Sequence, residues 1–521
     1  MCYNIGIYRT IFIVNEQIPM DLNEEYVMIY NTIQGLIRHG IRSGLITEED
    51  ELVVRNQLMD LLHLTDWEDC AGRSGSLDEL LDEVVDYACA NGIIEQTAVQ
   101  RDLFDTRVMG VFTPMPHEVN REFSRQYAQS PEAATNWYYA FCKNLNYVRA
   151  GRIAKDLKWT YASDYGTLDI TINRSKPEKD PRDIAAAKNQ KSAAYPKCQL
   201  CPENMGFAGH LTHPARQNLR PVPVEIQQEK WFLQYSPYGY YHEHCILFHS
   251  RHVQMVIDRS VFEKLFDFLE QFPHYFIGSN ADLPIVGGSI LSHEHFQGGK
   301  YTFPMETASV EKPFVLKDFP EVTAGLVKWP MSVIRLTSAN RAQLVQACDH
   351  ILQKWRSYTN PDVGIYARTE DTPHNTITPI ARMRNGRLEC DLVLRNNRTS
   401  PERPLGIFHP NPSLHHIKKE NIGLIEVMGL AVLPARLAVE LDVLREKMLA
   451  RADLMKDPRT APHAEWAVQV LHAHPEFAPE HAEQILRLEV GKVFEQVLCD
   501  AGVFKRTTQG REAFLDFVKG L

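Results

Sequence analysis

The sequence has no excess of positive charge, and its apolar runs are short. Its 521 residues carry a formal net charge of −10 at pH 7. Proteins that bind nucleic acid usually present a basic stripe, so this balance argues against a nucleic-acid partner. An apolar run from Ile5 to Val14 is interrupted by Arg9 and is too short to span a bilayer. No small-residue cleavage site follows it, so we expect no membrane association and take the cytoplasm as the default location.

Cysteines with a diagnostic spacing are also scarce. Ten cysteines are scattered over the chain, and only Cys198 and Cys201 have a spacing that points to a function. This distribution is typical of reduced cytosolic cysteines and not of a disulfide framework. A hydrophobic content of 44% and a charged content of 23% are those of an ordinary globular protein.

The first third of the chain is predicted to be helical. A helix is expected to begin at Met20, so residues 1–19 would be an extension without structure of its own, and translation could start at Met1 or Met20. Over residues 20–158 apolar residues recur at intervals of three and four, which predicts a helical domain. A change of pattern at Trp159 and a charged linker beyond it mark the domain boundary.

Two sheet-containing halves are expected next, over residues 159–310 and 311–433. The order strand, strand, helix, strand occurs in both, which would suit a duplicated sheet. The expected strands are 231–235, 245–248, 253–257 and 275–278 in the first half, and 314–317, 332–336, 378–384 and 388–395 in the second. The expected helices are 260–272 and 339–358. Helical periodicity returns over residues 434–521, which predicts a C-terminal helical region.

One stretch, from Gly288 to Gly299, combines an apolar run with two histidines and a glutamine. In an extended segment alternate side chains share a face, so His293, His295 and Gln297 would lie together, with Glu294 and Phe296 on the other side. An imidazole with one nitrogen fixed by a hydrogen bond and the other free is a nucleophile at neutral pH. Flanking glycines let backbone N–H groups approach a phosphate. A pair of solvated histidines is the simpler alternative.

The segment GGSILSHEHFQGG resembles the His-x-His-x-Gln signature of galactose-1-phosphate uridylyltransferases, which are a branch of the histidine triad superfamily. The resemblance is to the second, bacterial type of these enzymes. Further matching stretches are CQLCPEN, EHCILFHSRH, GSNADLPIVGG, HNTITPIAR, DLVLRNN and GLIEVMGLAVLPARL. The resemblance implies an α+β fold. In this fold two histidine-triad-like antiparallel-sheet halves are flanked by N-terminal and C-terminal helical regions.

The resemblance also implies a reaction and its catalytic residues. His295 would attack the α-phosphorus of UDP-glucose, release glucose 1-phosphate and then pass the uridylyl group to galactose 1-phosphate by a ping-pong route. Gln297 can donate a hydrogen bond to a phosphoryl oxygen but cannot shuttle a proton, which favours transfer over hydrolysis. His293 would lie beside the nucleophile. No organic cofactor is implied, and first-type relatives are dimers, so a homodimer is a further implication.

Several polar residues are candidates for substrate binding. Asn280, Ser289 and Ser292 are near enough in sequence to the histidines to bind phosphate, although the serine of the first-type pattern falls at Ile290 here. Arg216 and Asn218 are candidates for nucleotide contact, and His374 and Asn375 for contact with sugar hydroxyls or phosphate. Glu426 resembles a glutamate that recognises hexose hydroxyls. The pair Lys418-Lys419 is most simply interpreted as solvated.

The second constellation is a metal site. Cys198 and Cys201 supply two thiolates at a spacing that suits tetrahedral zinc, and His252 with His293 would complete the set as in metal-containing first-type relatives. Such a zinc would be structural; a metal-free site is the alternative, and His242 and His244 are competing ligands only by proximity. A second metal of the first-type enzymes is not expected, because Leu388 to Leu392 (LECDL) replaces its histidine pair.

Two other functions remain open at the level of sequence. A nucleotidyl hydrolase or dinucleotide phosphorylase of the same superfamily would use a similar site. A zinc-held scaffold protein, in which the H-x-H pair only ligates metal, belongs to a different class. The scaffold hypothesis predicts similar folding defects for His293→Ala and His295→Ala, whereas the enzyme hypothesis predicts that His295→Ala folds but is inactive.

Overall fold

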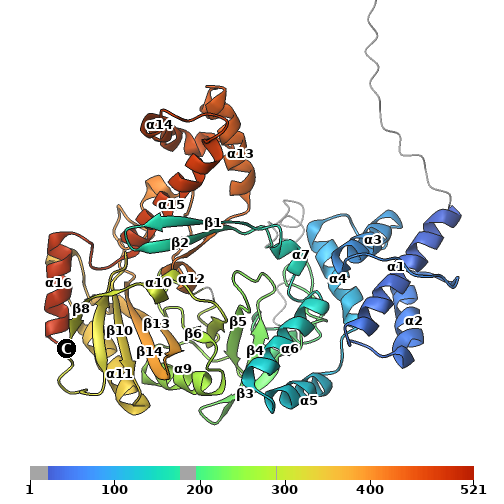
Figure 1. The fold of residues 1–521 in the computed structure, drawn as a ribbon, viewed down its shortest axis with the longest axis horizontal. Helices are drawn as coiled ribbons and strands as arrows, with labels where there is room; N and C mark the ends of the chain where they lie inside the picture. The colour runs from blue at the N-terminus through green and yellow to red at the C-terminus, as the bar shows by residue number, and fades with distance from the viewer. Residues whose placement is uncertain (1–21, 176–194, 289) are drawn as a thin grey trace, which may run out of the picture. The chain divides into compact units, whose positions relative to one another are not determined.

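A computed structural model describes residues 22–175, 195–288 and 290–521 (Figure 1). The expected extension 1–19 and the candidate Ser289 lie outside these residues. The chain forms two compact units, Met1–Glu95 and Gln96–Leu521. Among the described residues, no helix combines the length and the apolar character needed to cross a membrane.

The first unit is helical, as its periodicity predicts. Its elements are α1 (Leu22–Arg42), the 3-10 turn η1 (Glu48–Asp50), α2 (Glu51–Leu61) and α3 (Leu77–Ala90). The start of α3 is fixed by a capping box, in which Ser76 Oγ accepts from Glu79 N at 3.3 Å and Glu79 accepts from Ser76 N at 2.8 Å. Its buried face carries Leu80, Val84 and Ala88, spaced by four residues.

The second unit begins with four helices and a strand pair. These elements are α4 (Ala98–Val111), α5 (Pro116–Tyr127), α6 (Pro131–Asn144), α7 (Ala150–Ile153), β1 (Leu157–Ser163) and β2 (Gly166–Ile172). Ser130 caps α6 by accepting from Ala133 N at 3.0 Å, and Pro131 occupies the first turn, where its missing N–H has no helical partner to lose. The capping serine and the proline after it thus fix where α6 begins.

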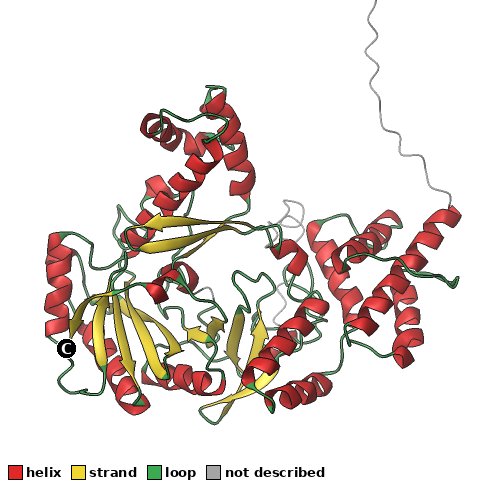
Figure 2. Cartoon of the chain, viewed as in Figure 1, coloured by secondary structure: helices red, strands yellow, loops and turns green. Residues whose placement is uncertain are grey.

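A ten-stranded sheet, antiparallel throughout, forms the centre of this unit (Figures 1 and 2). Its strand order is β3-β4-β5-β7-β6-β13-β14-β10-β9-β8. The first half contains β3 (Val222–Ile226), β4 (Glu229–Tyr235), β5 (Cys245–His249), α9 (Arg259–Gln271), β6 (Phe276–Gly278) and β7 (His295–Gly299). The second contains β8 (Val310–Phe314), β9 (Thr323–Val327), β10 (Val333–Ser338), α11 (Arg341–Ser357), β13 (Asn375–Arg384) and β14 (Arg387–Asn396).

The two halves have the same topology. Each runs strand, strand, strand, helix, strand, strand, and in each the last strand inserts between the third and the fourth. The halves meet where β6 pairs with β13, at Ile277 opposite Ala381. The duplicated α+β sheet predicted from the element order is therefore confirmed.

The expected strand over residues 253–257 is wrong. The segment joins no sheet: Met255 N donates to Leu291 O at 2.9 Å, and Val253 O accepts from Glu294 N at 2.7 Å. Its backbone therefore bonds to the loop that leads into β7 and not to a neighbouring strand. Within the ten-stranded sheet, β3 and β9 were not expected. Pro223 argues against a strand in the sequence pattern of β3. The strand tolerates this proline because β3 lies at the edge of the sheet.

A small sheet and the C-terminal helices complete the unit. The small sheet has the order β1-β2-β15, and the later elements are α12 (Leu424–Val427), β15 (Leu430–Leu433), α13 (Arg436–Leu449), α14 (Ala464–Ala473), α15 (Ala482–Ala501) and α16 (Thr508–Lys519). Short elements are α10 (Pro304–Thr307), the hairpin β11 (Arg368–Thr369) and β12 (Thr372–Pro373), and the 3-10 turns η2 (Pro202–Asn204), η3 (Pro361–Val363), η4 (Pro412–Leu414), η5 (Leu454–Lys456) and η6 (Ala461–His463).

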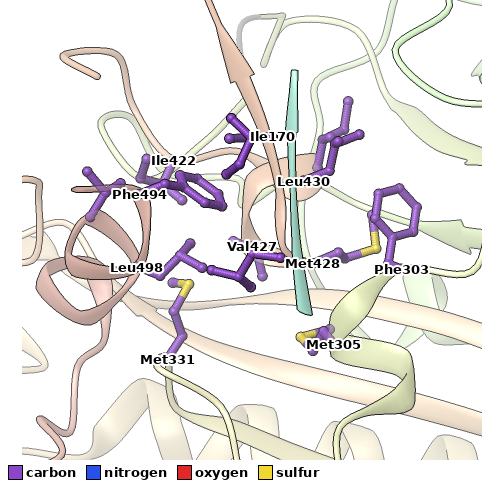
Figure 3. Close-up of a cluster of buried hydrophobic side chains, with 14 of the residues drawn as sticks. Ile170, Phe303, Met305, Met331, Ile422, Val427, Met428, Leu430, Phe494 and Leu498 are labelled. Atoms are coloured by element: carbon purple, nitrogen blue, oxygen red, sulfur yellow. The ribbon is translucent and has the colours of Figure 1, made fainter. Parts of the chain in front are cut away.

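An apolar cluster joins this small sheet to the ten-stranded sheet (Figure 3). Ile170 of β2, Val427 of α12 and Phe494 of α15 are buried in it together. Burial of one such side chain contributes about 1.5–3 kcal/mol. Trp329 adds a hydrogen bond from its indole N–H to Val427 O at 2.9 Å. The cluster thereby holds the segment before β15 against the sheet, and that segment lines the cavity described below.

Candidate functional site

Strand β7 presents its polar residues on one face of the sheet. Phe296 points to the opposite face and stacks on Trp231, with ring centroids 5.4 Å apart. Glu294, just before the strand, accepts from Lys264 of α9 at 2.6 Å. Because side chains alternate along a strand, His295 and Gln297 lie together on the face away from α9, as the sequence predicts.

His295 is held with one ring nitrogen free. Its Nδ1 is 2.8 Å from the backbone oxygen of His293. A carbonyl oxygen only accepts, so Nδ1 carries the proton and Nε2 carries a lone pair. Burial lowers the pKa of His295, which favours the neutral ring. His295 as a whole is 6% exposed.

His293 belongs to a cluster of four metal-ligating side chains, together with Cys198, Cys201 and His252. Their ligand atoms all lie within 4.8 Å of one another. Cys198 Sγ is 3.3 Å from His293 Nδ1, and Cys201 Sγ is 3.2 Å from His252 Nδ1. The structure thus brings together the four residues that the sequence singles out.

The cluster fits a tetrahedral metal ion. His293 Nε2 donates to His249 O at 2.7 Å, which leaves Nδ1 unprotonated and directed at the thiols. Burial and the neighbouring Cys198 raise the pKa of the Cys201 thiol to about 12, so a cation is needed to replace its proton near neutral pH. Two sulfur and two nitrogen ligands are a common set for structural zinc.

A cavity of about 670 Å³ opens beside Gln297. Its lining includes Asn280, Gln297 and Glu426 of the predicted site, and Gly287 and Gly288 from the loop before β7. Gly288 has φ +22°, and a Cβ there would lie 2.8 Å from a Leu291 methyl group. This glycine therefore allows the loop to run close to the cavity.

One wall of the cavity is fixed by polar contacts. Asn280 Oδ1 accepts from Leu424 N at 2.9 Å, which ties the loop after β6 to the start of α12. Glu426 accepts from Lys418 Nζ at 2.9 Å and from Gly423 N at 3.2 Å. These bonds hold the Glu426 carboxylate at the cavity wall.

The interpretation of Lys418 as a solvated residue is wrong. It is 3% exposed and lines the cavity. Burial alone would lower its pKa, but Glu426 and Glu420 outweigh this effect and the pKa of Lys418 is raised. A charged lysine therefore lies beside Glu426, a pairing that sequence reasoning missed because the two residues meet only through the turn of the chain between them.

His244 is a second polar neighbour of the site that sequence reasoning did not select for a role. It is 3% exposed, and its Nε2 is 3.0 Å from Gln297 Oε1. The register of β5 and β7 places Ile246 opposite Gln297, so His244 is its diagonal neighbour on the same face. The only sequence signal was a histidine directly before a strand.

The other predicted substrate-binding residues lie elsewhere in the second unit. Asn218 is buried and donates to Leu145 O at 2.9 Å, and the Arg216 guanidinium lies over the Tyr147 ring at 5.8 Å. His374 contacts Asn397 Oδ1 at 2.9 Å, and Asn375 donates to Trp355 O at 2.7 Å. Ser292 is exposed on the loop before β7. These contacts leave their substrate-binding roles as predictions.

Comparison with known proteins matches two family descriptions to this chain. "Galactose-1-phosphate uridyl transferase, N-terminal domain" matches residues 44–254, and the C-terminal domain of the same family matches residues 268–468. No solved structure shows significant similarity to the chain.

Curated relatives extend the match over nearly the whole chain. A galactose-1-phosphate uridylyltransferase of Fusobacterium nucleatum is 51% identical over 501 residues, covering 94% of this chain and 98% of the relative. That of Clostridium acetobutylicum is 50% identical, covering 94% and 99%. That of Bacillus subtilis is 48% identical, covering 95% and 98%.

The duplicated sheet, the histidine on its inner strand and these matches define a nucleotidyltransferase. The resemblance seen in the motifs is thus confirmed over most of the length. The chain belongs to the galactose-1-phosphate uridyl transferase family.

Proposed function

We propose that this chain transfers the uridylyl group of UDP-glucose to galactose 1-phosphate, by a ping-pong route through a uridylyl-histidine at His295. The observation that carries the proposal is the fixed ring of His295, whose Nδ1–H donates to His293 O at 2.8 Å and leaves Nε2 free. Gln297 follows on the same face and lines the cavity. Relatives at about half identity are named for this activity.

Each half-reaction exchanges one bond to phosphorus. The Nε2 lone pair attacks the α-phosphorus, the bond to the bridging oxygen breaks, and glucose 1-phosphate leaves with the electron pair. A phosphate oxygen of galactose 1-phosphate then attacks the same phosphorus, and the P–N pair returns to Nε2. The group displaced in the first half-reaction and the group that attacks in the second are both sugar phosphate anions that need no proton transfer, which suits a glutamine at position 297. The His293 carbonyl accepts from Nδ1–H and stabilises the positive charge on the ring.

The cavity residues supply binding. We assign the Gln297 amide and the backbone N–H groups of Gly287 and Gly288 to phosphoryl oxygens. These neutral groups can donate hydrogen bonds to the negatively charged oxygens. Glu426 is assigned to the hexose hydroxyls, with Lys418 holding its carboxylate. Asn280 shapes the wall through its bond to Leu424 N.

A structural zinc is part of the proposal. Cys198, Cys201, His252 and His293 would hold it, and when bound it would supply a rigid four-coordinate link between the segment at 198–201 and the start of β7. His293 would then be fixed both by its ring and by the backbone. Since the carbonyl of His293 orients His295, a bound metal would affect the reaction only through the position of His293.

Location and assembly are carried over from the sequence. Cys142, Cys245, Cys348 and Cys390 are buried free thiols, in line with a reducing compartment, and we propose the cytoplasm. We also propose a homodimer, as the resemblance implies. Sedimentation analysis of the active protein tests this, and a fully active monomer would refute it.

Isotope exchange tests the proposed reaction. Labelled glucose 1-phosphate should enter UDP-glucose in the absence of galactose 1-phosphate, because a covalent intermediate uncouples the two half-reactions. UMP accumulation without exchange would support the hydrolase alternative. Neither exchange nor UMP, in protein that binds zinc, would support the scaffold alternative.

A further inference from the structure

We propose that His244 is a positioning residue that sets the orientation of the Gln297 side-chain amide, so that its NH2 group faces the cavity. This inference rests on the proposed role of Gln297 as a donor to a phosphoryl oxygen. The two ends of an amide have the same shape but opposite hydrogen-bonding character, so a rotation by half a turn would present an acceptor to the phosphate.

The contact geometry selects one orientation. His244 Nε2 lies 3.0 Å from Gln297 Oε1; His244 directly precedes β5, two residues from Ile246, which lies opposite Gln297 of β7. An N–H at Nε2 donates to Oε1. Both hydrogens of Gln297 Nε2 then remain for other acceptors, and Gln297 is the part of this pair that lines the cavity.

The surroundings of His244 favour the tautomer that this requires. Its Nδ1 is buried and has no hydrogen-bond partner among the described residues. A lone pair left without a partner is better tolerated in a buried site than an unpaired N–H, so the proton belongs on Nε2. The rings of Tyr240 and Tyr241 lie 5.4 Å and 4.5 Å from the imidazole and enclose it.

The ring also stays uncharged. Burial lowers the pKa of His244 to about 4, although the bond to Gln297 opposes this effect. A neutral ring has one donor and one acceptor, and the geometry assigns the donor to Gln297. His244 thus acts on the substrate through Gln297 and does not touch the reacting atoms.

A double-mutant cycle tests the proposal. The rate of uridylyl-enzyme formation is measured for His244→Phe, Gln297→Ala and the double variant, with His244→Gln as the conservative change that restores a donor. Gln297→Ala should slow formation about 10- to 100-fold, since hydrogen bonds to charged groups have effects of this size. His244→Phe should slow it about 5- to 30-fold, and in the Gln297→Ala background its effect should fall below about twofold.

The outcomes separate this inference from the function on which it rests. Partial recovery in His244→Gln, with unchanged affinity for UDP-glucose, supports the inference. Full multiplicative effects in the double variant would overturn it, because His244 would then act independently of Gln297. No uridylyl-enzyme in the wild-type protein would instead refute the proposed function. His274→Phe, at a half-buried histidine that contacts Thr135 Oγ1, controls for loss of a packed ring.

Discussion

The two halves of the ten-stranded sheet share a topology but differ in what their inserted strands carry. In the first half, β7 places His295 and Gln297 on one face of the sheet, and Gln297 lines the cavity. In the second half, β14 alternates Glu389 and Asp391, and both carboxylates are buried beside arginines. The same scaffold therefore carries two different polar constellations.

The buried charged groups of the second half pair with one another. Asp391 is 0% exposed and accepts from Arg335 Nε at 2.6 Å and from Arg382 Nη2 at 2.7 Å. Arg382 Nε also donates to Glu389 at 2.8 Å, and Arg335 Nη2 donates to Met305 O at 2.8 Å. Every charge in this network has an opposite partner, so it has little capacity left for a ligand.

The constellation of the first half leaves bonding capacity free. Nε2 of His295, the NH2 group of Gln297 and Nδ1 of His293 belong to side chains whose other polar atom is hydrogen-bonded to a neighbour. The comparison indicates that a polar residue on an inner strand points to function when some of its hydrogen-bonding atoms are left without a protein partner. When its partners are complete, as around Asp391, the residue indicates structure.

The largest effect that separates the halves is expected at His295. His295→Ala removes the nucleophile and should lower kcat by about 10⁴-fold or more, with the melting temperature and metal content retained. Steady-state formation of UDP-galactose and a thermal melt measure both. His474→Ala is the control, at a histidine of the C-terminal helical region that contacts Glu489 at 2.8 Å. Its kcat should stay within about threefold of the wild-type value. Equal loss in both variants would contradict a specific role.

The metal cluster should give the next largest effect. Cys201→Ala should abolish binding of one zinc per chain and lower the free energy of unfolding by about 5 kcal/mol or more, because structural zinc sites bind with about 10–16 kcal/mol in peptides. Metal analysis and denaturant unfolding are the measurements. Cys348→Ala, at a buried cysteine outside the cluster, should keep its metal.

His293→Ala distinguishes the metal ligand from its neighbour. It should lose the metal as Cys201→Ala does, whereas His295→Ala should keep it. If both histidine variants lost metal and stability alike, the scaffold hypothesis would stand and the assignment of His295 as nucleophile would fail.

Breaking the network of the second half should affect stability and not chemistry. Asp391→Ala removes the buried carboxylate that pairs with both Arg335 and Arg382 and should lower the free energy of unfolding by about 3–5 kcal/mol. The kcat of the folded fraction should stay within about threefold. Asp516→Ala, which removes an exposed pair with Lys519, should cost less than about 1 kcal/mol. A large fall in kcat at full stability would place Asp391 in the reaction after all.

The smallest expected effect is a pH dependence of the same network. Burial alone would raise the pKa of Asp391, but Arg382 and Arg335 outweigh it and hold the pKa below its usual range. This contribution to stability is therefore present above the unfolded-state pKa of about 3.9 and is lost as pH falls below it. The difference in unfolding free energy between wild type and Asp391→Asn should be constant from pH 7 to 5 and shrink below about pH 4. A difference that grew on acidification would contradict the sign.

The sequence predicted those features whose physical cause is local or carried by a motif. Alternation in β7 placed His295 and Gln297 on one face, and the C-x-x-C spacing with His252 and His293 anticipated the metal cluster. Lys418 and His244 could not be predicted in this way. Lys418 is buried only because the chain returns over the cavity, and the role of His244 follows from the register of β5 against β7. The strand prediction for residues 253–257 was wrong for a similar reason. The residues there favour a strand, but their backbone bonds to a loop and not to a neighbouring strand.

The most direct test of the central claim is the intact mass of the protein after brief incubation with UDP-glucose at neutral pH, since phosphoramidates are acid-labile. The account predicts a gain of one uridylyl group that disappears on addition of galactose 1-phosphate and is missing in His295→Ala. The same gain in His295→Ala, or no gain in wild-type protein that still forms UDP-galactose, would contradict transfer through His295.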